Sequence, residues 1–155
     1  MFAGSGRGED GCVQDDEILD QWARRARLMS PVTIPDAVRG WHDMESGLVL
    51  RRAEDGWHVD VDNRGASLTE AILPTEADAN RYLLLSLGLR WRVESDLGDL
   101  FSADAAPGSL VTKDGPRFSV LAGGRLAFIR HRAAACRYTH IVGLPLAAIS
   151  VRLLT

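Results

Sequence analysis

The chain has 155 residues, of which 46% are hydrophobic and 25% charged, values typical of a single globular domain with its own core. They exclude an intrinsically disordered chain and a fibrous repeat. The formal net charge of −3 at pH 7 also argues against a basic footprint that would neutralise phosphates, so we expect no nucleic acid partner.

The cysteines and the apolar stretches indicate the cellular compartment. Cys12 and Cys136 are expected to be reduced thiols, because no secretory signal is visible. The longest apolar stretch, residues 141–149, covers about half of a membrane span. We therefore expect a soluble, cytoplasmic protein that does not enter the membrane.

The first thirty residues are expected to form a tail and a helix. Residues 1–13 are rich in glycine and charge and are predicted to be a disordered tail, which leaves 14–155 as a single domain. An amphipathic helix over 15–29, ended by Pro31, is indicated by hydrophobic residues at helical spacing: Ile18, Trp22, Ala26 and Met29.

The next segment predicts a meander of strands. Residues 30–46 show no clear period and are expected to be a connection with a short helical turn before Trp41. Residues 48–52 and 57–62 flank an Asp-Gly turn and predict a hairpin, and 67–73 predict a third strand. In the second strand a buried face alternates with a solvated one: Trp57, Val59 and Val61 against His58, Asp60 and Asp62.

The second half of the chain predicts a central helix, a hairpin and a C-terminal helix. Thr75 is expected to cap a helix that ends at Gly88, and residues 89–100 either continue it or cross irregularly. The remaining segments are predicted as a loop (103–115), a hairpin (117–122 and 125–130), a strand (138–142) and a helix (145–153). The predicted fold is therefore α+β, with antiparallel β hairpins packed against an N-terminal, a central and a short C-terminal helix.

No motif indicates catalysis, a cofactor or a metal. Residues 6–11 match G-x-G-x-x-G but lack the preceding strand of a dinucleotide site. The aspartates near Asn63 do not form a calcium loop, because Ala71 stands where position twelve of the loop requires glutamate. The histidines and cysteines are too scattered in the sequence to suggest a zinc site. We therefore predict a binding protein rather than an enzyme.

Two groups of residues are candidates for contact with a partner. The first is the solvated strand face with the adjacent turn: His58, Asp60, Asp62 and Arg64. The second is Arg90 with Trp91, residue types that are enriched at interface hot spots, although Trp91 fits a core role equally well.

The central helix also carries a family resemblance. Residues 79–88 read A-x-R-Y-L-L-x-x-L-G after two strands, and the later hairpin leads to Tyr138-Thr139-His140 and an apolar helix. This order resembles the immunity protein 61 family of bacterial antitoxins, the group that includes the tuberculosis necrotizing toxin immunity factor, over residues 48–154. The resemblance implies a protein, monomeric before complex formation, that binds a cognate secreted toxin domain and blocks its active site. For the named member that toxin hydrolyses NAD.

Two other functions remain open from the sequence. A small-molecule-binding or regulatory module would line a pocket with the aromatic residues between sheet and helix. A hydrolase with a dispersed triad would need a histidine in a cleft, because serine, histidine and aspartate meet only in space.

Overall fold

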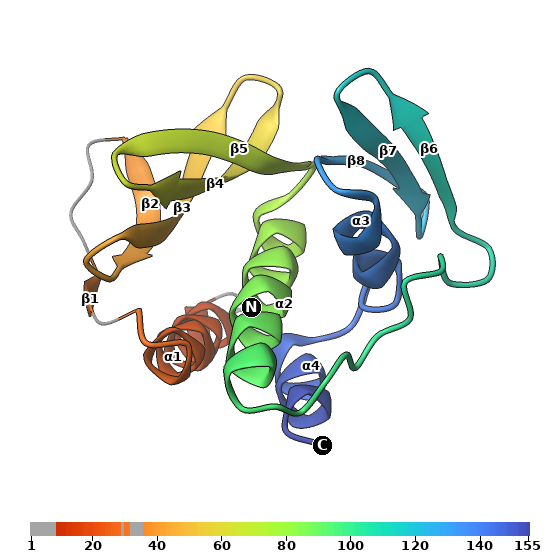
Figure 1. Ribbon diagram of the computed structural model, residues 1–155. Coiled ribbons are helices and arrows are strands. Elements are labelled where there is room, and N and C mark those ends of the chain that lie inside the picture. The colour runs from red at the N-terminus through yellow and green to blue at the C-terminus, as the bar shows by residue number, and fades with distance from the viewer. Residues whose placement is uncertain (1–8, 29, 32–35) are drawn as a thin grey trace, which may run out of the picture.

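The computed structural model describes residues 9–28, 30–31 and 36–155. Its described strands form one antiparallel sheet in the order β1-β2-β3-β4-β5-β8-β7-β6, and the helices cover one side of it with α2 in the middle (Figure 1). The strands are β1 (Ser30–Pro31), β2 (Ala37–His42), β3 (Ser46–Ala53), β4 (Gly56–Asn63), β5 (Ala66–Leu73), β6 (Leu110–Asp114), β7 (Arg117–Ala122) and β8 (Arg125–Ile129). The helices are α1 (Glu9–Arg25), α2 (Glu76–Glu94), α3 (Arg132–Thr139) and α4 (Leu146–Leu153). The predicted α+β class is confirmed.

Both predicted hairpins are present. β3 pairs with β4 and β7 with β8, each through a tight turn that uses glycine at positive φ: Gly56, Gly123 and Gly124. The alternation predicted for β4 also places Val59 in the core, against Leu50 of β3 and Ala71 of β5. Local pattern and turn chemistry were sufficient here, because the paired residues are close in sequence.

Several predicted segments differ from the structure. The helical turn expected before Trp41 is strand β2, whose alternation is interrupted by a register shift between Ala37 and Arg39. The loop expected at 103–115 contains β6, an edge strand with mostly exposed side chains. The strand expected at 138–142 is instead occupied by the end of α3, which begins in an alanine-rich segment that favours helix.

The N-terminal helix is longer than predicted. It begins at Glu9 rather than at residue 15, so residues 9–13 belong to α1 and not to a disordered tail. The rest of that predicted tail, residues 1–8, lies outside the described residues. In the part of the chain that the structure describes, no helix combines the length and apolar character that a membrane span requires.

Helix α2 continues through Gly88 to Glu94 instead of ending at the glycine. Gly88 is fully buried within the helix, and a Cβ atom placed on it would lie 2.4 to 2.9 Å from the side chain of Leu153 in α4. The glycine therefore permits close packing of α2 on α4 and does not terminate the helix.

The first turn of α2 is fixed by the buried carboxylate of Asp78, which is 1% exposed. It accepts hydrogen bonds from the Thr75 hydroxyl (2.8 Å), from Arg81 (2.8 Å) and from Arg125 of β8 (2.8 and 3.0 Å). The Arg81 Nε also donates to the carbonyl of Leu144 at 2.7 Å. One carboxylate thus joins α2 to β8 and to the link between α3 and α4.

Asp78→Ala should lower the free energy of unfolding by about 3–5 kcal/mol, because it leaves two arginines without their buried partner. Urea denaturation of both proteins measures this difference. Asp99→Ala is the matched control: Asp99 binds Arg137 at 3.0 Å but is 67% exposed, so its loss should change stability by less than about 1 kcal/mol. Equal effects of the two changes would contradict the role given to Asp78.

Gly88→Ala should destabilise the protein by about 1–3 kcal/mol through the clash with Leu153. This is opposite in sign to the gain of about 0.5–1 kcal/mol that alanine brings to an ordinary helix interior. Val93→Ala in the same helix, at a position 69% exposed, should change stability by less than about 0.5 kcal/mol. A more stable Gly88→Ala variant would show that the two helices are not tightly packed here.

Candidate functional site

The turn between β2 and β3 is organised by the carboxylate of Asp43. This carboxylate accepts hydrogen bonds from the backbone N–H groups of Glu45 (2.8 Å) and Ser46 (2.6 Å) and from the Ser46 hydroxyl (3.1 Å). Aspartate suits this position because its short side chain can bind the backbone two residues further on. The Ser46 and Glu45 N–H groups, with a smaller contribution from Arg90, hold the pKa of Asp43 well below its usual range.

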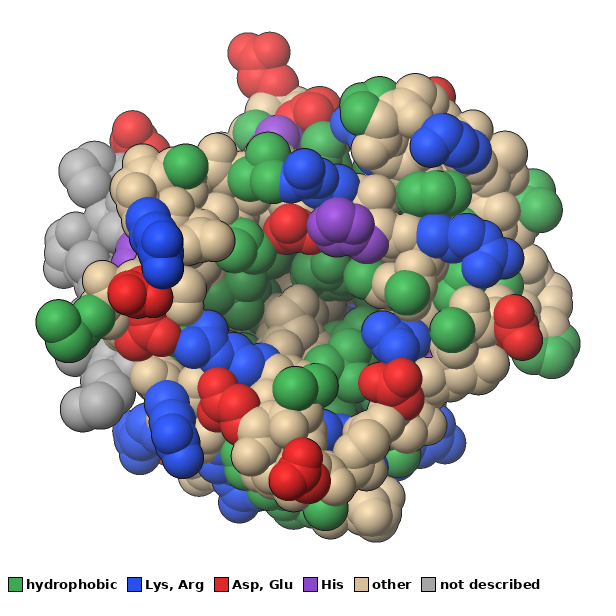
Figure 2. Space-filling view, in the orientation of Figure 1, with side chains coloured by type: hydrophobic (Ala, Val, Ile, Leu, Met, Phe, Trp, Pro, Cys, Tyr) green, Lys and Arg blue, Asp and Glu red, His purple; other side chains and the backbone are tan. Residues whose placement is uncertain are grey.

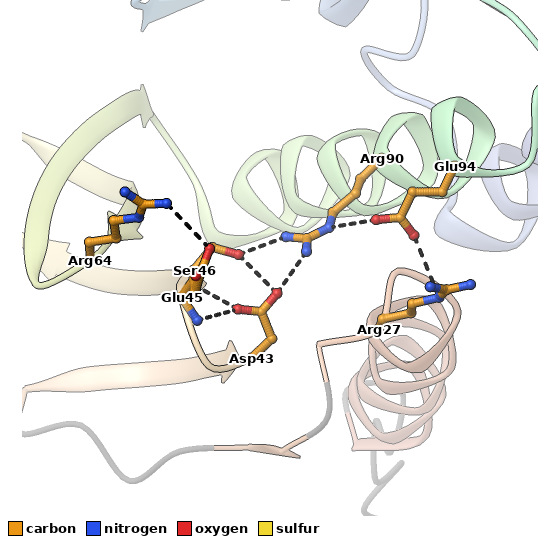
Figure 3. A network of polar contacts seen from close by, with 7 residues as sticks. All are labelled: Arg27, Asp43, Glu45, Ser46, Arg64, Arg90 and Glu94. Carbon is orange, nitrogen blue, oxygen red and sulfur yellow. Dashed lines mark hydrogen bonds and ion pairs between the residues drawn. The ribbon is translucent and has the colours of Figure 1, made fainter.

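Arg90 of α2 binds this turn from the helix side. Its guanidinium donates to Asp43 at 2.8 Å and to the Ser46 hydroxyl at 3.0 Å (Figure 3). Its Nε lies 3.5 Å from Glu94, whose other oxygen is 4.0 Å from Arg27 at the end of α1. The network therefore connects the turn to both helices beside it.

The turn is also connected to the next hairpin. The Arg64 backbone N–H, between β4 and β5, donates to the Glu45 carbonyl at 2.8 Å. The Arg64 side chain approaches the Glu45 carboxylate at 3.8 Å, although both side chains are more than 70% exposed (Figure 3). The backbone bond fixes the turn, and the exposed ion pair contributes little to stability. We call residues 43–46 with Arg64 and Arg90 the turn site.

Met44 occupies the tip of the turn site and is fully exposed. A single apolar side chain surrounded by charged residues on a fixed backbone has the arrangement of an interface anchor with a polar rim. Methionine is also well suited to contact, because its flexible thioether adapts to an apolar pocket.

A cavity lies on each side of the turn. On the outer face of the sheet a polar hollow of about 470 Å³ is lined by His42, the 43–45 segment, Arg51, Asp62, Arg64, Gly65 and Ser67. On the helix side an apolar cleft of about 150 Å³ is lined by Leu28, residues 46–48, Val61, Ser86, Leu87 and Arg90. Figure 2 shows that the face between sheet and helices is hollowed, with hydrophobic side chains inside and charged ones around the rim.

Three of the six predicted contact residues lie at or beside the turn site. Asp62 and Arg64 line the polar hollow, and Arg90 binds Asp43 directly. Asp62 also lies 3.3 Å from His42, whose ring packs directly over Gly47. A Cβ added at Gly47 would lie 2.4 to 2.6 Å from the imidazole, so a larger residue there would displace the His42 ring.

The other three predicted residues lie elsewhere. His58 binds Asp55 at 2.6 Å near the opposite end of the hairpin. Asp60 is only 6% exposed and binds Arg51 (3.0 Å) and the Thr69 hydroxyl (2.8 Å), so the strand face is not solvated throughout as predicted. Trp91 packs edge-on against Trp22 of α1, with 5.4 Å between the ring centroids, and is partly buried.

The residues at the centre of the site, Asp43 to Ser46, were not among the predicted contact residues, because their segment shows no strand periodicity. The available signal was the Asp43-x-x-Ser46 spacing of a side-chain-bound turn. Within the described residues, no group of three or more His, Cys, Asp and Glu side chains is placed to hold a metal ion. Cys136 is a buried free thiol.

Asp43→Asn should lower the free energy of unfolding by on the order of 1 kcal/mol at pH 7, because it removes the charge of the carboxylate that accepts hydrogen bonds from Arg90 and two N–H groups. The pKa of Asp43 is depressed in the folded state, so the advantage of the wild type is complete above the ordinary carboxyl pKa of about 4 and declines as the pH falls below it. Urea titrations from pH 7 to pH 3 measure the trend. If the difference in free energy of unfolding between the wild type and Asp43→Asn grew as the pH fell, the depressed pKa of Asp43 would be contradicted.

No protein-family model matches this sequence, and none of the curated proteins matches it. One solved structure, described as Rv3902c from M. tuberculosis, is similar, with a TM-score of 0.69 and 15% sequence identity. The match covers 100% of this chain and 92% of that chain. At this identity the similarity shows a shared fold alone, and the immunity protein 61 resemblance gains no support at the level of sequence.

Proposed function

We propose that this protein is a non-catalytic immunity protein of the bacterial cytoplasm, which binds a cognate secreted toxin domain, an NAD glycohydrolase, and blocks its active site. The observation that carries the proposal is the turn site, in which a fully exposed Met44 is held on a backbone fixed from three sides. The resemblance of the central helix to the immunity protein 61 family supports the choice of a toxin as partner.

The rigidity of the turn favours protein binding. A loop that is ordered before binding loses little conformational entropy in the complex, so more of its contact energy appears as affinity. Asp43 and Arg90 supply this order through bonds of 2.6 to 3.0 Å within the free protein. A protruding, fixed turn also has the shape needed to enter the concave active site of an enzyme.

The charged rim favours selection of one partner. Glu45 and Arg64 are both exposed beside Met44, and they present charges of opposite sign on the same surface. Such charges contribute mostly to specificity and to the rate of association. The alternative of a small-molecule-binding module is less favoured for two reasons. The apolar cleft of about 150 Å³ is below the roughly 300 Å³ of typical ligand sites, and the larger hollow of about 470 Å³ is lined mostly by polar and charged residues rather than by the apolar ones typical of such sites.

The direct test is inhibition of the cognate toxin domain that the proposal requires. Purified toxin domain is titrated with purified protein while NAD hydrolysis is followed, and the mixture is analysed by size exclusion with light scattering. We expect inhibition that is complete at one equivalent, together with a 1:1 complex. Full NAD hydrolysis in the presence of excess folded protein would refute the proposal for this pair.

Met44→Asp should weaken inhibition at least tenfold, because it places a charge at the centre of the contact, where hot-spot substitutions cost about 2 kcal/mol or more. Stability should be unchanged, since the side chain is fully exposed. The matched control is Val151→Asp, which adds the same charge at an apolar residue of α4 that is 64% exposed. If both variants inhibit like the wild type, the turn site is not the interface.

A further inference from the structure

The sheet is nearly divided where β5 meets β8. The two strands share only two registered pairs, Ala71 with Ile129 and Ile72 with Phe128, and one further bond from the Arg130 N–H to the Glu70 carbonyl (2.8 Å). β5 extends back to Ala66, whereas the chain leaves β8 at residue 130 and turns into α3. No described strand therefore pairs with this side of β5 over residues 66–69.

The position that a longer β8 would occupy is a notch of about 270 Å³. It is lined by residues 68–72 of β5, by Pro116 and Arg117 at the start of β7, and by Phe128 and Arg130. Phe118 of β7 pairs with Ile129, so Arg117 already lies beyond the end of β8. The notch thus has an open strand edge on one side and the start of β7 on the other. Figure 1 shows the β3–β4 and β6–β7 hairpins diverging on either side of this junction.

Arg117 lines this notch and, among the described residues, forms no ion pair, although its charge acts on the Asp55 carboxylate from a distance. Its guanidinium lies 4.1 Å from the centroid of the Phe128 ring and makes no hydrogen bond within the same part of the chain. The acidic groups nearby are already bound: Asp55 pairs with His58 at 2.6 Å, and Glu70 pairs with His131 at 3.6 Å and Arg130 at 3.8 Å. A guanidinium whose carbon lies over an aromatic ring can still donate its N–H groups to a carboxylate.

The sequence that follows the notch is rich in basic residues. Residues 110–139 contain six basic side chains and one acidic side chain, in a chain whose overall net charge is −3. The basic residues are Lys113, Arg117, Arg125, Arg130, Arg132 and Arg137, and the acidic one is Asp114. Arg125, Arg130 and Arg137 are already paired with Asp78, Glu70 and Asp99. The attraction for an acidic segment at the notch therefore comes mainly from Arg117.

We propose that the notch is a docking site for an extended, acidic segment of a partner protein, which adds a strand to the open edge of β5 and places a carboxylate on Arg117. Backbone hydrogen bonds to an open edge give affinity in this mode of recognition, and side-chain contacts give specificity. The site is separate from the turn site and does not rest on the proposed toxin inhibition.

The experiment measures binding of a fluorescent peptide of alternating valine and glutamate by anisotropy. Two matched peptides are used, one with lysine in place of glutamate and one with N-methylated backbone amides. We expect the acidic peptide to bind and the other two to bind at least about tenfold more weakly, since loss of a charged hydrogen bond costs about 1.5–3 kcal/mol. Arg117→Ala should weaken the acidic peptide to the same degree.

Lys113→Ala is the matched control variant. Lys113 is on the same hairpin and lies 5.3 Å from the Phe118 ring, but Phe118 belongs to the face that packs on the core. The control should bind the acidic peptide like the wild type, and unchanged unfolding curves would show that both variants are folded. Equal binding of the acidic and lysine peptides, or full binding by Arg117→Ala, would overturn the proposal. A concentration-dependent dimer that Arg117→Ala abolishes would also overturn it, by assigning the notch to a second copy of the chain.

Discussion

The buried carboxylate of Asp78 is the interaction on which the rest of the structure depends. A carboxylate without access to water is stable only when cations and hydrogen bonds replace its hydration, and here Thr75, Arg81 and Arg125 do so. The carboxylate also matters for the sheet, because the pairing between β5 and β8 is weak: the two strands share only two registered pairs. The direct bond between Asp78 and Arg125 therefore ties the second half of the sheet to the central helix, where the sheet itself provides little connection.

The other end of α2 explains how the turn site is held in place. Arg92 is 5% exposed and donates hydrogen bonds to the carbonyls of Leu97, Gly98 and Leu153. Leu153 is the last residue of α4, so the positive charge of Arg92 lies at the C-terminal end of that helix, where the helix dipole favours it. Arg90 lies two residues earlier on the same fixed turn of helix and binds Asp43. The exposed Met44 is thus positioned by the core helix as well as by its own hairpin. The turn that we propose to contact a partner should therefore lose little conformational entropy on binding.

The elements that sequence reasoning recovered are those whose interactions are local. Alternation around glycine turns predicted the β3–β4 and β7–β8 hairpins, and the Thr75 cap predicted the start of α2. The missed strands lack such a signal: the register shift near Ala37 breaks the alternation of β2, and β6 is an edge strand with few buried residues. Gly88 has the usual character of a helix end, but the helix continues because α4 packs against it. That reason lies 65 residues further along the chain, at Leu153.

The candidate residues also divide into those set by local sequence and those set by contacts between distant segments. The sequence by itself determined the α+β class, the two hairpins and the places where α2 and α4 begin, because these depend on side-chain periodicity and on capping residues a few positions apart. It also placed Asp62, Arg64 and Arg90 among the contact residues. Only the tertiary structure decided that Asp60 and Trp91 make internal contacts, and that Asp43 binds Arg90 across 47 residues. It also decided that β8 pairs with β5 over only two registered positions and that Arg117 lines the notch beside them. Each of these facts depends on which distant segments meet, and that is set by packing of the whole chain.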